Sequence, residues 1–223
     1  MSINKIKTVG IYGGSFNPVG HHHIDVMKEA KKCVDELWVM PIGNHPLNKN
    51  IIDVSHRINM LKIAYDSMLK RQKGIILNLQ QTMYDGAKLD IPDDKELKSY
   101  APQSTCDLMN WLRKNYDGIE FYIVIGSDNA DNIYKWHNYE NLLKENKFII
   151  VNREMKCRYT PNNKYFNSNN VIKIINTIGN NRRGYKSSTE IRNMIKEGNF
   201  KEAEKYCPKK VVDYIIKEGL YGK

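Results

Sequence analysis

The sequence predicts an α/β fold: a Rossmann-like, doubly wound parallel sheet followed by a small C-terminal helical subdomain. One observation is an apolar strand at 9–12 that runs through Gly13-Gly14 into a helix with apolar positions at helical spacing. Another is the continuous apolar run at 121–125, which is typical of a strand buried on both faces. Such runs alternate with amphipathic stretches along the chain, as expected for strands joined by helical crossovers.

The first half of the chain continues with a second buried strand at 36–42 and a polar, turn-rich loop at 43–49. Residues 55–64 carry apolar side chains at the spacing of an amphipathic helix, and a third strand is expected at 74–79. The hydrophilic passage 83–104 predicts a long loop. It could serve as a lid, an oligomer contact or a plain surface insertion.

The second half begins with a helix that opens at Thr105 and leads into the strand ending at Gly126. Two further strands are expected at 147–152 and 171–176. Helices fill the remainder, and the first of them begins at Ser187, which has a glutamate three residues later as in a capping box. We therefore expect a single domain over 1–223, with an α/β core at 1–185 and C-terminal helices at 186–223.

Composition, charge and cysteine spacing indicate which functional classes of protein the chain is expected to belong to. Hydrophobic residues make up 41% of the chain and charged residues 27%, as in ordinary globular proteins, and no apolar run reaches 18 residues. We expect a cytoplasmic protein with no membrane partner. The net charge is +10, but the lysines are interleaved with glutamates on helix faces, so no nucleic-acid partner is expected. The four cysteines are far apart without CxxC spacing, which predicts reduced thiols and no metal site.

The segment after the first strand suits a phosphate. Gly13 and Gly14 permit backbone conformations and close approaches that side chains would block. Asn17-Pro18 then prevents helix formation until after the proline. The exposed amides at the start of the following helix are expected to form an anion site.

Two motifs carry a resemblance to a known family. Gly13-Gly14-Ser15-Phe16-Asn17-Pro18, followed by His23, resembles the nucleotidyltransferase signature GG-S/T-F-D/N-P-x-H-x-G-H. Residues 187–192, with the sequence SSTEIR, resemble its second signature, ISST-x-IR. Together they are similar to the motifs of nicotinate or nicotinamide mononucleotide adenylyltransferases.

The resemblance implies a transfer of the adenylyl group from ATP to a pyridine mononucleotide, with Mg²⁺ accompanying ATP and pyrophosphate released. Such an enzyme would act in NAD biosynthesis. Nicotinate and nicotinamide mononucleotide are equally open as acceptors, and a homo-oligomer is left open. The alternatives are another acceptor such as pantetheine phosphate, or a nucleotide-binding protein without catalysis.

The family also implies roles for particular residues. His23 and Arg192 are the expected catalytic residues. The expected ATP-binding residues are Gly13, Gly14, Ser15, Phe16, His23, Gly126, Asp128, Ser187, Ser188 and Arg192. Those expected to bind the mononucleotide are Ser15, Lys49, Thr105, Trp136 and Arg153.

Several assignments leave an alternative open. Lys49 shares its loop with His45, either of which could reach phosphates or simply face solvent. Arg57 is expected to face the active site or to make a surface ion pair, and Trp136 to stack on the pyridine ring or to belong to the core. Ser187 could be a helix cap rather than a phosphate ligand.

The chain departs from the first signature at two positions. Gly20 stands where the family usually has its first histidine, and His22 stands at the usual glycine. A histidine ring at position 22 could crowd the adenine. The departure therefore leaves the non-catalytic alternative in place.

Overall fold

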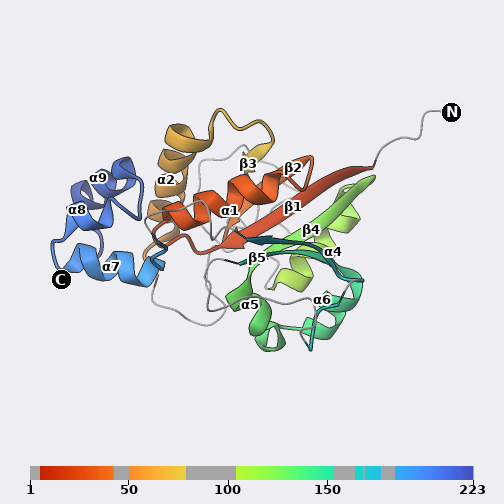
Figure 1. The fold of residues 1–223 in the computed structure, drawn as a ribbon. Coiled ribbons are helices and arrows are strands. Elements are labelled where there is room, and N and C mark those ends of the chain that lie inside the picture. The colour runs from red at the N-terminus through yellow and green to blue at the C-terminus, as the bar shows by residue number, and fades with distance from the viewer. Residues whose placement is uncertain are drawn as a thin grey trace.

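The computed structural model describes residues 6–42, 51–78, 104–152, 164–167, 169–176 and 184–222. These residues form a six-stranded sheet in the order β3-β2-β1-β4-β5-β6, in which every neighbouring pair is parallel. The sheet and its flanking helices are shown in Figure 1. The predicted Rossmann-like α/β class is confirmed.

The strands are β1 (Lys7–Gly14), β2 (Glu36–Pro41), β3 (Ile75–Leu77), β4 (Ile119–Gly126), β5 (Lys147–Asn152) and β6 (Val171–Asn176). The helices before β5 are α1 (His21–Lys31), α2 (Val54–Ala64), η1 (Tyr65–Leu69), α4 (Thr105–Asn115), α5 (Ser127–Asp131), η3 (Ile133–Lys135) and α6 (Tyr139–Glu145). The C-terminal helices are α7 (Ser188–Lys196), α8 (Phe200–Ala203) and α9 (Lys209–Lys217). The third strand is shorter than expected, and α2 continues into the π-helical turn η1.

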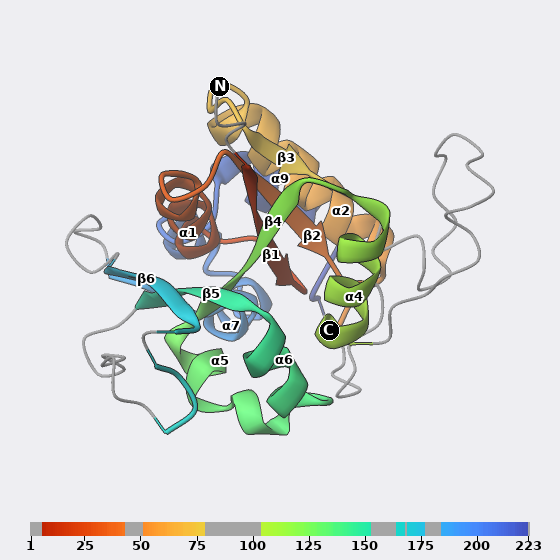
Figure 2. The ribbon, with the colours of Figure 1, turned by 90° about the vertical axis from the view of Figure 1, so that its right-hand side faces the viewer.

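Side-chain alternation along the strands creates two cores, one on each face of the sheet. Tyr122 and Val124 of β4 belong to the core shared with α1, α2 and the C-terminal helices. Phe121, Ile123 and Ile125 belong to the opposite core, shared with α4, η3 and α6. Figure 2 shows α1 on one side of the sheet and α4 and α6 on the other. The central strands β1, β2, β4 and β5 are buried on both faces over most of their length, which explains their continuous apolar sequences, whereas β6 at the edge of the sheet is largely exposed.

The C-terminal helices are part of the first core. Ile191 and Ile195 of α7 and Val211, Val212 and Ile215 of α9 are buried in it. The division of the chain at residue 185 stays a prediction. Within the part of the chain that the structure describes, no helix is long and apolar enough to cross a membrane.

A buried arginine joins the ends of β1 and β2 to α2. The Arg57 side chain is 1% exposed. Its Nε donates to the Ile52 carbonyl at 3.1 Å, and its Nη1 donates to the carbonyls of Ser15 at 2.9 Å and Ile42 at 2.7 Å. The surface ion pair considered from sequence is therefore wrong. Arg57 instead fixes the backbone where the two central strands end.

Replacing Arg57 with methionine is expected to lower the free energy of unfolding by about 3 kcal/mol, because buried carbonyls would lose their donors while the side-chain volume is kept. Chemical denaturation measures this loss. Lys62→Met, on the exposed face of the same helix, is the matched control and should change stability by less than about 0.5 kcal/mol. Equal losses in both variants would contradict a role for the carbonyl contacts.

Candidate active site

The candidate site lies where the strand order reverses. β1 and β4 are parallel neighbours, and the chain proceeds outward from them in opposite directions across the sheet. In open α/β sheets, the crevice at the carboxyl ends of such strands is the usual ligand site. Both strands end in glycine at this edge, β1 with Gly13 and Gly14 and β4 with Gly126.

Residues 13–20, here called the motif loop, comprise the last two residues of β1 and the connection to α1. Phe16 has a positive φ of 46° and is 1% exposed. Its ring centroid lies 5.7 Å from that of Tyr12 and 5.2 Å from that of His23. A Cβ on Gly14 would lie 3.1 Å from the Phe16 ring, so this position favours glycine. The Phe16 side chain is thus core, and any contact with ATP would come from the loop backbone.

His23 is the third residue of α1 and lies half-buried beside the motif loop. Its Nδ1 accepts a hydrogen bond from the Gly20 amide at 3.0 Å. In a neutral imidazole that accepts at Nδ1, the proton is on Nε2. The loop backbone therefore makes Nε2 a donor.

Gly20 and His22 depend on each other sterically. His22 is 6% exposed, and its ring centroid lies 3.8 Å from that of His23. A Cβ on Gly20 would lie 2.7 Å from His22 Nδ1 and 3.0 Å from Ile191 Cδ1. The usual histidine at position 20 would collide with the ring at position 22. The two departures from the signature therefore belong together, and the His22 ring packs inside the protein.

The second motif begins α7 with a reciprocal cap. Ser187 Oγ accepts from the Glu190 amide at 3.2 Å, and Glu190 Oε2 accepts from the Ser187 amide at 2.9 Å. Glu190 also pairs with Lys186 at 2.8 Å. The Lys186 contact and the Ser187 amide hold the pKa of Glu190 below its usual value. Ser187 is thus the helix cap that the sequence suggested.

The next turn of α7 contacts the motif loop directly. Ser188 Oγ donates to the Pro18 carbonyl at 2.9 Å. Arg192 Nη1 donates to the Asn17 carbonyl at 2.7 Å, and its Nη2 donates to Thr189 Oγ1 at 3.0 Å. The two sequence motifs, about 170 residues apart, therefore form one structural unit.

Backbone amides at the two helix starts differ in what they can bind. The His21 amide donates to the Tyr206 carbonyl at 2.8 Å, and the His23 amide donates to the Gly20 carbonyl at 3.0 Å. The first turn of α1 is thus partly satisfied by the protein, contrary to the expected anion site of exposed amides. Among the described residues, no hydrogen bond satisfies the amides of Ser188 and Thr189. The start of α7 is the better anion site.

The other predicted residues are placed as follows. Gly126 ends β4 and is buried, and Asp128 is exposed in the first turn of α5. Thr105 begins α4 and is half-buried. Trp136 follows η3 and packs half-buried against the second core. Lys49 and Arg153, together with His45, lie outside the described residues, so their roles remain predictions.

Sequence reasoning missed two contacts at this site. Asn17 is 2% exposed, and its Oδ1 accepts from the Tyr221 hydroxyl at 2.7 Å. Arg57 Nη1 donates a hydrogen bond to the Ser15 carbonyl in the loop. No local signal could have revealed the first contact, since it joins residues 204 positions apart.

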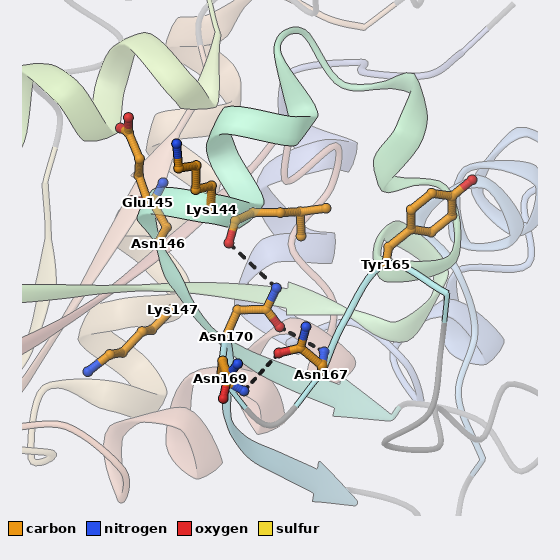
Figure 3. Close-up of a pocket in the computed structure, with 9 residues that line it drawn as sticks. Lys144, Glu145, Asn146, Lys147, Tyr165, Asn167, Asn169 and Asn170 are labelled. Carbon is orange, nitrogen blue, oxygen red and sulfur yellow. Dashed lines mark hydrogen bonds between the residues drawn. The ribbon is translucent and has the colours of Figure 1, made fainter.

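A cavity of about 420 Å³ lies at the amino ends of the strands, between the end of α6 and the start of β5 (Figure 3). Three asparagines of its lining, Asn167, Asn169 and Asn170, bond to other lining residues. Asn170 Nδ2 donates to the Leu143 carbonyl at 3.5 Å, and the Asn167 amide donates to Asn170 Oδ1 at 2.9 Å. Because it borders the amino ends of β5 and β6, this cavity is separate from the candidate site. No group of three or more metal-ligating side chains occurs in the described ranges.

The steric dependence of Gly20 on His22 makes a testable prediction. Gly20→Ala is expected to lower the free energy of unfolding by about 1–3 kcal/mol, because the new methyl group overlaps the His22 ring. In a His22→Ala background the same change should cost about 1 kcal/mol less, since part of the overlap is gone and the Ile191 contact remains. Denaturation of the two single variants and the double variant measures the coupling. Strictly additive losses would contradict it.

Comparisons with known proteins agree with this geometry. Residues 11–194 match the cytidylyltransferase-like family model. The chain is 30% identical over 219 residues to a probable nicotinate-nucleotide adenylyltransferase of Streptococcus pyogenes serotype M3, covering 96% of this chain and 89% of that protein.

Two solved structures also match. Both are of the Plasmodium falciparum nicotinic acid mononucleotide adenylyltransferase, and each is 26% identical with 96% of this chain and 97% of that chain covered. The TM-score is 0.76 for its complex with NaAD and 0.73 for its complex with APC. The chain therefore belongs to the cytidylyltransferase-like family and is a nucleotidyltransferase related to the nicotinate-nucleotide adenylyltransferases.

Proposed function

We propose that this protein transfers the adenylyl group of ATP to nicotinate or nicotinamide mononucleotide and releases pyrophosphate. The observation that carries the proposal is the contact of Ser188 and Arg192 with the carbonyls of Pro18 and Asn17. This contact joins both nucleotide motifs around His23. The choice of reaction is supported by the relatives, which are named as nicotinate-nucleotide or nicotinic acid mononucleotide adenylyltransferases.

Adenylyl transfer mainly requires positioning and charge stabilisation. An oxygen of the mononucleotide phosphate attacks the α-phosphorus of ATP in line, the bond to the β-phosphate oxygen breaks, and pyrophosphate leaves. The attacking phosphate is already ionised, so no general base is needed. The protein has to hold two polyanions together and stabilise the extra charge on the pentavalent centre.

His23 is the proposed donor to the α-phosphate. Its Nε2 proton follows from the Gly20 contact at Nδ1, which holds the ring in one tautomer before substrate arrives. A donor that is already oriented stabilises developing charge without reorganisation. The amides of Ser188 and Thr189 and the Arg192 guanidinium are the proposed partners of the departing pyrophosphate.

The acceptor site is proposed on the other side of the crevice. Trp136 follows β4 and is half-buried, so one part of its ring belongs to the core while another part remains for stacking on a pyridine. Ser15 and Thr105 are proposed to contact the mononucleotide. Lys49 and Arg153 are retained as proposed ligands of the mononucleotide.

Mg²⁺ is the proposed ion that accompanies ATP, where it would offset phosphate charge. Asp128, an exposed carboxylate in the first turn of α5, is the proposed contact to the ATP ribose or to a water on the ion. Phosphate oxygens and water suit the remaining positions of a hard cation. The cytoplasm, where ATP and mononucleotides are dissolved, is the proposed location.

A pyrophosphate-release assay tests the proposal. ATP and Mg²⁺ are combined with nicotinate mononucleotide, nicotinamide mononucleotide or pantetheine phosphate in parallel reactions. Turnover with a pyridine mononucleotide is expected, and the faster of the two identifies the acceptor. Turnover with pantetheine phosphate alone would contradict the assignment of a pyridine mononucleotide as the acceptor. ATP binding without turnover would instead support a binding protein.

The role of His23 generates a separate prediction. His23→Ala is expected to lower kcat by about 100- to 1,000-fold, because one oriented donor to the transition state is lost. The ATP dissociation constant should change by less than about tenfold, since other groups still hold the nucleotide. Initial rates and an ATP titration measure the two quantities.

Lys28→Ala, one turn further along α1, serves as the control and should leave kcat near the wild-type value. Wild-type kcat in the His23→Ala variant would remove the histidine from the mechanism. A loss of ATP affinity that accounts for the whole decrease would make it a ground-state ligand instead.

A further inference from the structure

The last residues of the described chain reach into the candidate active site. The Tyr221 hydroxyl donates to Asn17 Oδ1 at 2.7 Å. Asn17 belongs to the motif loop and is 2% exposed, so water does not readily replace this donor. The contact therefore bears on the shape of the loop.

The end of the chain is folded so as to place Tyr221 there. Past α9, Gly219 and Tyr221 both have positive φ, at 61° and 63°, and these residues turn the chain back toward the domain. The Leu220 amide donates to the Ile215 carbonyl at 3.0 Å and closes this turn. The Tyr221 ring packs against the first core. A non-glycine residue with positive φ costs conformational energy, which these contacts offset.

The chemistry of the pair fixes the direction of the hydrogen bond. Burial raises the pKa of the Tyr221 hydroxyl above its usual value, so the hydroxyl stays protonated at physiological pH. The amide oxygen of Asn17 can only accept. Tyr221 is therefore a permanent donor to the motif loop.

Other C-terminal residues also hold this loop and the start of α1. Arg192 and Ser188 bind the carbonyls of Asn17 and Pro18. Cys207 Sγ donates to the Val19 carbonyl at 3.2 Å, and the Tyr206 carbonyl accepts from the His21 amide at 2.8 Å. These contacts reach backbone atoms, whereas Tyr221 reaches the Asn17 side chain. They leave the orientation of that side chain to Tyr221.

We propose that Tyr221 is a positioning residue for the loop that receives the phosphates of ATP. The Tyr221 hydroxyl holds the Asn17 side chain. Asn17 is connected along the backbone through Pro18 to Gly20, and the Gly20 amide orients the His23 ring. The proposal rests on the proposed function for its nucleotide, while the restraint on the loop exists without any ligand. Tyr221→Phe keeps the ring and removes the donor.

The matched control is Tyr214→Phe. The Tyr214 hydroxyl also lies among the C-terminal helices and bonds to His56 Nδ1 at 2.8 Å and Asn59 Nδ2 at 3.2 Å. These partners are on α2 and do not belong to the motif loop. Both variants lose a hydroxyl with bonding partners, so a general loss of stability would affect both.

Hydrogen exchange of the unliganded full-length protein is the first measurement. In Tyr221→Phe the amides of His21 and His23 are expected to exchange about tenfold faster than in wild type, while those of β4 are unchanged. Tyr214→Phe should leave the His21 and His23 amides at the wild-type rate. Unchanged exchange of these amides in Tyr221→Phe, or an equal increase in both variants, would overturn the proposal.

ATP titration and turnover are the second measurement. Tyr221→Phe is expected to weaken ATP binding or lower kcat by about tenfold, and Tyr214→Phe to leave both near wild type. Asn17→Ala removes the group to which the Tyr221 hydroxyl donates. Adding Tyr221→Phe to this variant should therefore cause no further change in ATP affinity or kcat. A second full loss in the double variant would overturn the proposed route through Asn17.

The two measurements separate this inference from the proposed function. A wild-type protein that binds ATP but turns over no acceptor would overturn the proposed reaction. The exchange rates and the ATP affinity of the two tyrosine variants would still decide the role of Tyr221.

Discussion

The candidate active site depends on hydrogen bonds between the motif loop and the C-terminal helices. Gly13, Gly14 and Gly20 of the loop have no side chains, and the sheet holds only the first two, at the end of β1. Restraint therefore comes from outside the loop, through Arg192 and Tyr221 at its side and Arg57 beneath it. A glycine-rich backbone can approach a phosphate closely, and the surrounding contacts remove the flexibility that glycine brings.

The two arginines near the loop illustrate how burial decides what a cation does. Arg57 is 1% exposed, so the desolvation cost of its charge has to be offset by its carbonyl partners, and it serves to hold backbone. Arg192 is half-buried beside the start of α7, where an anion can also reach it. The two arginines thus have different surroundings, Arg57 buried among carbonyl groups and Arg192 partly exposed.

Local patterns predicted most of the fold and part of the site. Strands such as β4 and β5 are continuous apolar runs, and the α7 cap is encoded within four residues at Ser187, so both were readable. Contacts between residues that are far apart in the sequence could not be predicted in this way. The Asn17–Tyr221 bond and the carbonyl partners of Arg57 leave no local trace in sequence. The roles of Lys49 and Arg153 stay predictions because both residues lie outside the described part of the chain.

The altered signature is best understood as a local packing exchange. The orientation of His23 depends on the backbone amide of residue 20, which any residue except proline provides. The identity of residue 20 decides instead whether a ring at position 22 has room, and glycine gives it that room. Gly20 and His22 therefore fit together between α1 and Ile191 of α7, while the Gly20 amide still bonds to His23 Nδ1. The hydrogen bond that orients His23 thus does not require the usual histidine at position 20.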